Sequence, residues 1–154
     1  LSEEEVRNLN IQKGTLLPEE REIINDHIVI TIEMLEKLPY PKQLKNVPEF
    51  AGGHHEKLDG TGYPKGLKSD EMSTQAKIMA IADIFEALTA ADRPYKDGKK
   101  LSQAMRIMGF MKNDLHIDQD LFEIFVKSKI HKNYAKKYLS ESQMDKVDEE
   151  AILA

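Results

Sequence analysis

The segment from Ile78 to Ala91 constrains the fold more than any other part of this sequence. Its residues are apolar on nearly every side of a helix, and its only charged residues are Asp83 and Glu86. A helix that is apolar all round belongs in the interior of a protein. A carboxylate there is costly unless it is paired or coordinates a metal ion. The segment therefore predicts a central helix with Asp83 as a candidate metal ligand. Glu86 could form a supporting contact that orients a metal ligand, or it could be a solvated charge, and the sequence favours neither interpretation.

Helical periodicity continues along most of the chain, and no segment alternates as a strand would. A helix is expected to start at Pro18 and to end before Pro39 and Pro41. Further helices are expected after Val47, from Ser73 or Thr74 to about Ala91, around Leu101 to Met111, after Asp118, and around Tyr134 to Tyr138. We expect an all-α bundle of about five to seven helices over residues 1–140, followed by an acidic, partly disordered tail over residues 141–154.

Composition excludes several classes of function. A chain of 154 residues is expected to form one domain. Its net charge of −5 argues against binding to a nucleic-acid polymer, although a few cations in a pocket would still suffice for one small anion. The absence of cysteine excludes disulfides and thiolate sites, so any metal ion must be bound by nitrogen and oxygen. No apolar run approaches the roughly 18 residues of a membrane span, and we expect a cytoplasmic location.

The stretch from His54 to Pro64 joins two adjacent imidazoles to two carboxylates and a glycine-broken turn. Residues 52–66 hold five of the eight glycines, which indicates an irregular loop with close backbone approaches. Imidazole and carboxylate are ligands for zinc, iron and manganese. Neighbouring side chains at a helix end diverge by about 100°, so the two histidines could serve different metal ions. An ordinary surface pair is the alternative. The expected loop residues are Glu56, Asp59, Gly60, Gly62, Tyr63 and Pro64.

Other candidate site residues lie outside this stretch. His27 falls on the apolar stripe of its helix. It could be a core histidine that is satisfied by a hydrogen bond, or it could be a metal ligand. Arg93 and Lys96 could clamp a phosphate, or could belong to a solvated loop. Tyr63 offers a ring for stacking and a hydroxyl. The two remaining histidines, His116 and His131, are expected to lie outside the site.

The string His54-His55-Glu56, followed by Asp59-Gly60-Thr61-Gly62-Tyr63-Pro64, resembles the signature of HD-GYP domains, a subgroup of the HD metal-dependent phosphohydrolases. The segments Ile81 to Thr89 and Asp92 to Tyr95 are similar to that family's downstream blocks, and the resemblance runs from about Gly14 to Phe125.

The resemblance implies a helical domain that binds two or more divalent metal ions. Iron or manganese are favoured, with magnesium, nickel or zinc as alternatives. It implies hydrolysis of the bacterial messenger cyclic di-GMP, or of another cyclic dinucleotide. By similarity, His27, His54, His55 and Asp83 match metal ligands. Tyr63, Arg93 and Lys96 match positions that contact the nucleotide.

One departure from the family pattern affects catalysis. No His-Asp dipeptide occurs in the sequence, and no histidine precedes His27. The bridging aspartate and the assisting lysine of the family are therefore absent, and no catalytic residue is assigned. We expect the chain to be a C-terminal piece of a longer protein with a sensor or regulatory domain upstream. Two alternatives stay open: a degenerate module that binds a cyclic dinucleotide without cleaving it, and a phosphohydrolase for another nucleotide.

Overall fold

The computed structural model describes residues 2–11, 17–91 and 98–154, and the regular secondary structure of these residues consists of helices without any strand. The prediction of an all-α fold is confirmed. Eight α-helices and two short 3-10 helices lie in the described residues, more than the five to seven expected, because short helices form near both ends of the chain. The chain divides into two compact units, residues 1–48 and 49–154, which are described separately.

The first unit holds α1 (Glu3–Leu9), α2 (Pro18–Glu36) and the 3-10 helix η1 (Lys42–Leu44). As predicted, α2 begins at Pro18. The expectation that its apolar stripe is buried together with His27 is wrong, because Ile23 is 71% exposed and His27 is exposed too, whereas Ile28 is buried. Residue spacing defines a helix face, but only neighbouring elements decide whether that face is covered.

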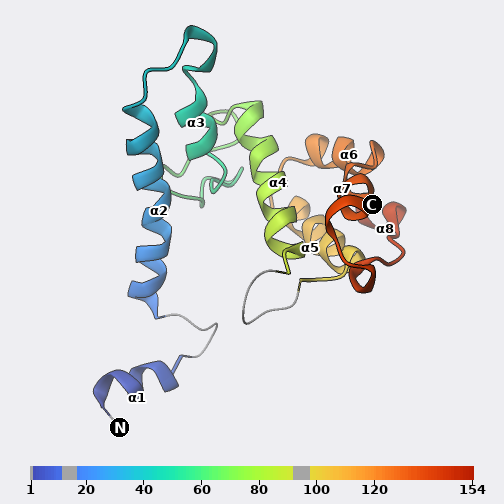
Figure 1. Cartoon of the computed structure of the whole chain (residues 1–154), viewed down its shortest axis with the longest axis horizontal. Helices are drawn as coiled ribbons and strands as arrows, with labels where there is room; N and C mark the ends of the chain where they lie inside the picture. The colour runs from blue at the N-terminus through green and yellow to red at the C-terminus, as the bar shows by residue number, and fades with distance from the viewer. Residues whose placement is uncertain (1, 12–16, 92–97) are drawn as a thin grey trace. The chain divides into compact units, whose positions relative to one another are not determined.

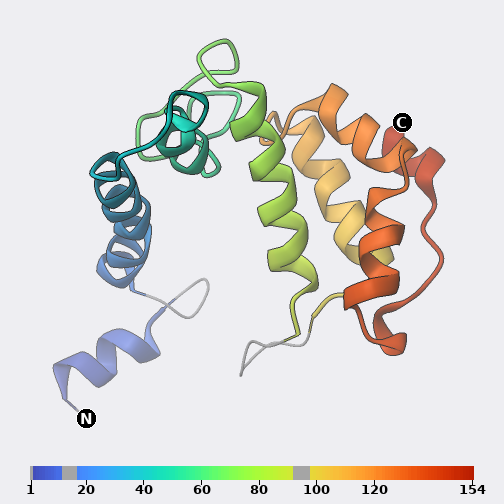
Figure 2. The same ribbon diagram turned by 45° about the horizontal axis from the view of Figure 1, so that its top comes forward.

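The second unit holds α3 (Val47–Gly52, which starts at the boundary), α4 (Thr74–Thr89), α5 (Leu101–Asn113), α6 (Gln119–Lys127), α7 (Ile130–Tyr138), the 3-10 helix η2 (Glu141–Gln143) and α8 (Glu149–Leu153). Helix α5 packs against α4, α6 and α8, and α6 packs against α7 (Figures 1 and 2). The predicted N-caps are confirmed, because the side chains of Ser73 and Asp118 accept hydrogen bonds from the first turns of α4 and α6.

One apolar cluster forms the core of this unit. The Phe85 ring meets Phe125 and Tyr134 edge to face, at centroid distances of 5.2 and 5.3 Å. Fully buried side chains from α5 and α6 fill the space beside these rings. The buried residues of the cluster include Ile81, Ala104, Met105, Met108, Ile117, Phe122 and Val126.

Helix α4 is buried along one face only. Ala80, Ile81 and Phe85 lie in the core, whereas Asp83 and Glu86 are exposed. The prediction that α4 is central and that Asp83 is buried is therefore wrong, whereas the exposure of Glu86 fits the solvated charge that was one of its two expected interpretations. Two neighbours, α5 and α6, cover one side of α4, and its apolar composition does not show which side they cover.

The segment after Ser140, expected to be an acidic and partly disordered tail, contains η2 and α8, and α8 packs on α5. Val147 is buried, and Asp145 accepts hydrogen bonds from the backbone N and Oγ of Ser102 at 2.8 and 2.6 Å. The Lys112 ammonium donates to the carbonyl oxygen of Leu153 at 3.2 Å, at the end of α8. Acidic composition alone indicates solubility, while these specific contacts hold the segment on α5.

No helix within the described ranges is both long and apolar enough to cross a membrane.

Candidate metal centre

A buried carboxylate holds the signature loop, residues 54–66, in its fold. Glu56 is 1% exposed, and its two oxygens accept hydrogen bonds from the backbone N atoms of Lys65 and Leu67 at 2.7 and 2.9 Å. Both oxygens are therefore engaged within the loop and its continuation. Glu56 belongs to the signature motif, and its contacts give it a role in closing the loop.

A tight turn at Asp59 brings the two halves of the loop together. The Asp59 carboxylate accepts hydrogen bonds from the backbone N and the Oγ of Thr61, at 2.9 and 2.7 Å, and these bonds lower the pKa of Asp59. Gly60 has a φ of 81°, which favours glycine. A Cβ on Gly62 would lie 2.3 Å from the backbone N of Lys57. The expected close backbone approach is confirmed at Gly62.

The structure brings His54, His55 and Tyr63 together. The imidazole centroids of His54 and His55 lie 4.2 Å apart, and a ring nitrogen of one is within 4.8 Å of a ring nitrogen of the other. The Tyr63 ring stacks on His55 at 4.9 Å and 14° between planes. The backbone N of Tyr63 also donates to the carbonyl of His55 at 3.2 Å. Two imidazoles and one phenol thus form a compact group.

The hydrogen bonding of His54 fits metal ligation. Its Nδ1 lies 2.5 Å from the carbonyl oxygen of Ala51. A carbonyl oxygen can only accept, so Nδ1 is the donor, and in the neutral imidazole the lone pair is on Nε2. Histidine ligands of metal ions are commonly held in this way, with one ring N–H donated to a backbone carbonyl.

His27 shows the same local arrangement in the first unit. Its Nδ1 donates to the carbonyl oxygen of Ile24, one turn earlier in α2, which again leaves the lone pair on Nε2. The sequence prediction of a ligand is therefore compatible with the tautomer of this exposed histidine.

The charge of Asp83 affects the pKa of Tyr63, the aromatic phenol beside the two histidines. Burial raises the pKa of Tyr63, and the negative charge of Asp83 raises it further. The phenol is therefore neutral at physiological pH and can donate a hydrogen bond. Although Asp83 lies on α4 and is exposed, its charge reaches the Tyr63 side of the loop.

Arg93 and Lys96, the expected phosphate contacts, lie outside the described residues. His131 is fully buried beside Phe125, with its Nε2 3.4 Å from Glu149, away from the signature loop as expected. His116 is partly buried and receives electrostatic effects from Lys57 and Asp59, so it lies near the loop without belonging to the histidine pair.

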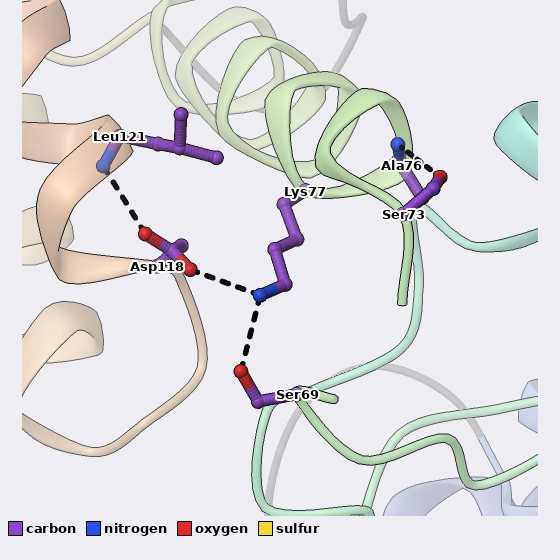
Figure 3. A network of polar contacts seen from close by, with 6 residues as sticks. All are labelled: Ser69, Ser73, Ala76, Lys77, Asp118 and Leu121. Carbon is purple, nitrogen blue, oxygen red and sulfur yellow. Dashed lines mark hydrogen bonds and ion pairs between the residues drawn. The ribbon is translucent and has the colours of Figure 1, made fainter. Parts of the chain in front are cut away.

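Lys77, a residue that sequence reasoning missed, ties the segment after the signature loop to α4 and α6. Figure 3 shows the Lys77 ammonium between Ser69 and Asp118, with its Nζ 3.1 Å from the Oγ of Ser69 and 3.1 Å from Oδ2 of Asp118. The other Asp118 oxygen accepts from the backbone N of Leu121, at the start of α6. A single lysine before an apolar run does not belong to a recognisable motif. The role of Lys77 therefore becomes apparent only in the fold, where its side chain is half-buried.

Known proteins are similar to this chain over much of its length. The family model described as HD domain matches residues 4–121. The chain is 39% identical over 117 residues to 3'3'-cGAMP-specific phosphodiesterase 3 of Vibrio cholerae, covering 75% of this chain and 24% of that protein. It is 38% identical over 117 residues to a cyclic di-GMP phosphodiesterase of Thermotoga maritima, covering 76% of this chain and 31% of that protein.

A third relative, 3'3'-cGAMP-specific phosphodiesterase 1 of Vibrio cholerae, is 43% identical over 82 residues, which are 53% of this chain and 19% of the relative. The chain thus spans less than a third of the length of each of these proteins. The domain match nevertheless covers most of the chain and includes the histidine pair and the signature loop. The chain therefore belongs to the HD domain family and is of the HD-GYP type.

Proposed function

We propose that this chain is part of a metal-dependent phosphodiesterase that hydrolyses a cyclic dinucleotide, with cyclic di-GMP as the leading substrate, in bacterial signalling. The observation that carries the proposal is the group of His54, His55 and Tyr63 on the signature loop. The names of the relatives support it, because they are phosphodiesterases for cyclic di-GMP or 3'3'-cGAMP.

His27, His54, His55 and Asp83 are the metal ligands in this proposal. Their nitrogen and oxygen donors suit iron or manganese, with magnesium, nickel and zinc as alternatives. We propose at least two ions in the intact site. When bound, such ions would lower the pKa of water and neutralise charge that develops on the phosphate. The carbonyl contacts at Ala51 and Ile24 orient the Nε2 atoms of His54 and His27 for this role.

The other residues bind and orient the nucleotide. The neutral phenol of Tyr63 donates a hydrogen bond, and its ring offers an aromatic surface beside the phosphate site. Arg93 and Lys96 neutralise the non-bridging oxygens of the phosphodiester. In the hydrolysis, the oxygen of water forms a bond to phosphorus, and the bond between phosphorus and the ribose oxygen on the opposite side breaks. The residue that protonates this leaving oxygen is unassigned.

A binding module without turnover is the second candidate function. It is favoured by one specific observation, which is that these 154 residues contain no His-Asp dipeptide. Under the leading proposal, that pair and a sensor or regulatory domain belong to an upstream part of a longer cytoplasmic protein. This part of the proposal is compatible with the chain covering only 24% and 31% of the two relatives aligned over 117 residues.

Metal content and nucleotide turnover test the proposal. The chain is purified anaerobically without chelator, its iron and manganese are measured by elemental analysis, and binding and cleavage of cyclic di-GMP and 3'3'-cGAMP are assayed separately. His54→Ala and His55→Ala should lose metal and nucleotide binding, whereas His116→Asn should retain both. Metal and nucleotide binding without cleavage would favour the second candidate. Absence of both metal and nucleotide binding in the chain and in any longer protein containing it would contradict both candidates.

A further inference from the structure

The two ends of the signature loop pair with each other. Part of this pairing is the Glu56 carboxylate, which binds two backbone N–H groups at the far end of the loop. In addition, the backbone N of Ser69 donates to the carbonyl oxygen of Leu58 at 3.1 Å. Residues 56–58 and 65–69 therefore lie side by side at the base of the loop.

The stack of Tyr63 on His55 depends on this pairing. His55 directly precedes residues 56–58, and Tyr63 lies in the turn that leads to residues 65–69. The backbone N of Tyr63 donates to the carbonyl oxygen of His55, so the two residues face each other across the same base. A shift of one segment along the other would therefore move the phenol ring relative to the imidazole.

The α5–α6 connection, residues 114–118, contacts the first of the two segments. The carbonyl oxygen of Leu115 accepts a hydrogen bond from the backbone N of Leu58 at 3.0 Å. Leu115 has a φ of 54°, the left-handed conformation that ends many helices. The turn at the end of α5 thus brings a backbone acceptor to the base of the loop.

Lys77 joins the same connection to the second segment (Figure 3). Its Nζ lies 3.1 Å from the Oγ of Ser69 and 3.1 Å from Oδ2 of Asp118. The side chains of Lys77 and Asp118 are only 15% and 20% exposed, so water competes weakly for these contacts. Asp118 is fixed in turn, because its other carboxylate oxygen accepts from the backbone N of Leu121 at the start of α6.

Together these contacts close a ring. The ring runs from Leu115 through Leu58 and Ser69 to Lys77, and it returns to the α5–α6 connection at Asp118. Sliding of one loop segment along the other would break bonds within the base and bonds to the connection. The loss of one member of such a network can therefore cost more than its own bonds.

We propose that Lys77 is a positioning residue of the metal centre: it holds residues 65–69 in register with residues 56–58 and thereby keeps Tyr63 stacked on His55. The metal part of this inference rests on the proposed function, in which His55 is a ligand. The Lys77 ammonium binds Ser69 and Asp118 rather than either ring, so it acts through the loop.

The test compares Lys77→Met with Lys77→Arg in this chain. Methionine removes the ammonium, whereas arginine keeps a cation of similar reach. Nuclear Overhauser effects between the ring protons of Tyr63 and His55, measured without metal, report on the stack, and calorimetry gives the Kd for manganese. For Lys77→Met we expect loss of most of the ring-to-ring signal. We also expect about fivefold weaker manganese binding, less than the tenfold or more caused by removing a direct orienting partner. Lys77→Arg should restore both readouts.

Two control variants separate positioning from a general loss of stability. Lys127→Met removes the lysine of the exposed pair with Glu123 and should leave both readouts near wild type. Gln143→Met destabilises the same unit elsewhere, because the buried Gln143 amide donates to the backbone carbonyls of Thr89 and Lys99 at 2.7 and 3.2 Å. It should lower the free energy of unfolding without changing either readout, since distant sites behave independently.

Ser69→Ala removes only the hydroxyl that Lys77 binds. It should change both readouts in the same direction by a smaller amount, so it serves if Lys77→Met does not fold. An unchanged ring-to-ring signal in Lys77→Met would overturn the inference, as would equal losses in Lys77→Met and Gln143→Met. A wild-type chain that binds no manganese would remove the metal part along with the proposed metal centre. The ring-to-ring signals would then still decide whether Lys77 positions the loop.

Discussion

The ring of Tyr63 lies stacked on the imidazole of His55, with centroids 4.9 Å apart and 14° between the planes. The loop that joins these residues is closed by Glu56, whose carboxylate binds two backbone N–H groups beyond Tyr63. The stack restricts the rotation of the imidazole. Tyr63 therefore orients a proposed metal ligand in addition to any contact it makes with a nucleotide.

Replacement of Tyr63 should separate these two roles. Tyr63→Phe keeps the stack and loses the hydroxyl, whereas Tyr63→Leu loses both. We expect Tyr63→Leu to weaken manganese binding about tenfold, which is the usual effect of removing a residue that orients a metal ligand. Tyr63→Phe should bind manganese like wild type and bind the nucleotide less tightly. Calorimetric Kd values check this, and equal manganese affinity in all three proteins would show that the stack does not orient His55.

Removal of the Glu56 carboxylate should destabilise the protein. Glu56→Ala leaves the backbone N–H groups of Lys65 and Leu67 without their acceptors, at an expected cost of about 3 kcal/mol in the free energy of unfolding. Glu71→Ala is the matched control, because the exposed Glu71 accepts one similar bond from the backbone N of Lys68. Its cost should be about 0.5 kcal/mol, within the range of surface substitutions. Urea unfolding with an unchanged m-value measures both. Similar losses in the two variants would argue against a special role for Glu56.

The half-buried pair of Lys77 and Asp118 should be energetically coupled (Figure 3). The two side chains are 15% and 20% exposed. A double-mutant cycle with Lys77→Met and Asp118→Asn should give a coupling of about 1 kcal/mol, and asparagine preserves the N-cap of α6. The exposed i,i+4 pair of Glu123 and Lys127 is the control and should give about 0.3 to 0.5 kcal/mol. A coupling at Lys77 no larger than that of the control pair would contradict the prediction.

Burial of His131 should make the protein less stable in mild acid. Burial lowers the pKa of His131 from its usual value of 6.5, the charge of Glu149 and a backbone contact at Phe125 oppose this effect, and the charges of Lys132 and Lys129 lower the pKa further. Neither ring nitrogen makes a well-formed hydrogen bond within the described residues. The unfolded chain therefore takes up a proton first, and stability falls as pH drops below 6.5 toward the folded-state pKa.

The apolar variant His131→Leu should remove this part of the pH dependence. The test is to measure the unfolding free energy of both proteins from about pH 7.5 to about pH 5, because an ordinary histidine titrates within this range. The stability difference between variant and wild type should shift in favour of the variant as the pH falls. A constant difference would show that folding does not change the pKa of His131, and a shift in favour of wild type would show that the histidine is protonated more readily in the folded chain. Either result would contradict the prediction.

Local signals predicted the helices and the loop well. Pro18, Ser73 and Asp118 were sufficient to place the starts of three helices, because capping depends on residues within one turn. The close approach at Gly62 was predictable for the same reason. Burial was predicted less well, since Asp83 and His27 are exposed on helices that their apolar neighbours suggested were covered.

The sequence by itself therefore determined the all-α class, the helix starts and the donor-rich loop from His54 to Pro64, because each depends on side-chain chemistry at short spacing. Only the tertiary structure showed that Glu56 closes the signature loop, that Lys77 joins Ser69 to Asp118, and that Gln143 binds the backbone carbonyls of Thr89 and Lys99. These contacts join residues up to 54 positions apart. Their partners are mostly backbone groups, which every residue carries, so no residue pattern marks them and only the packing of the helices brings them within hydrogen-bonding distance.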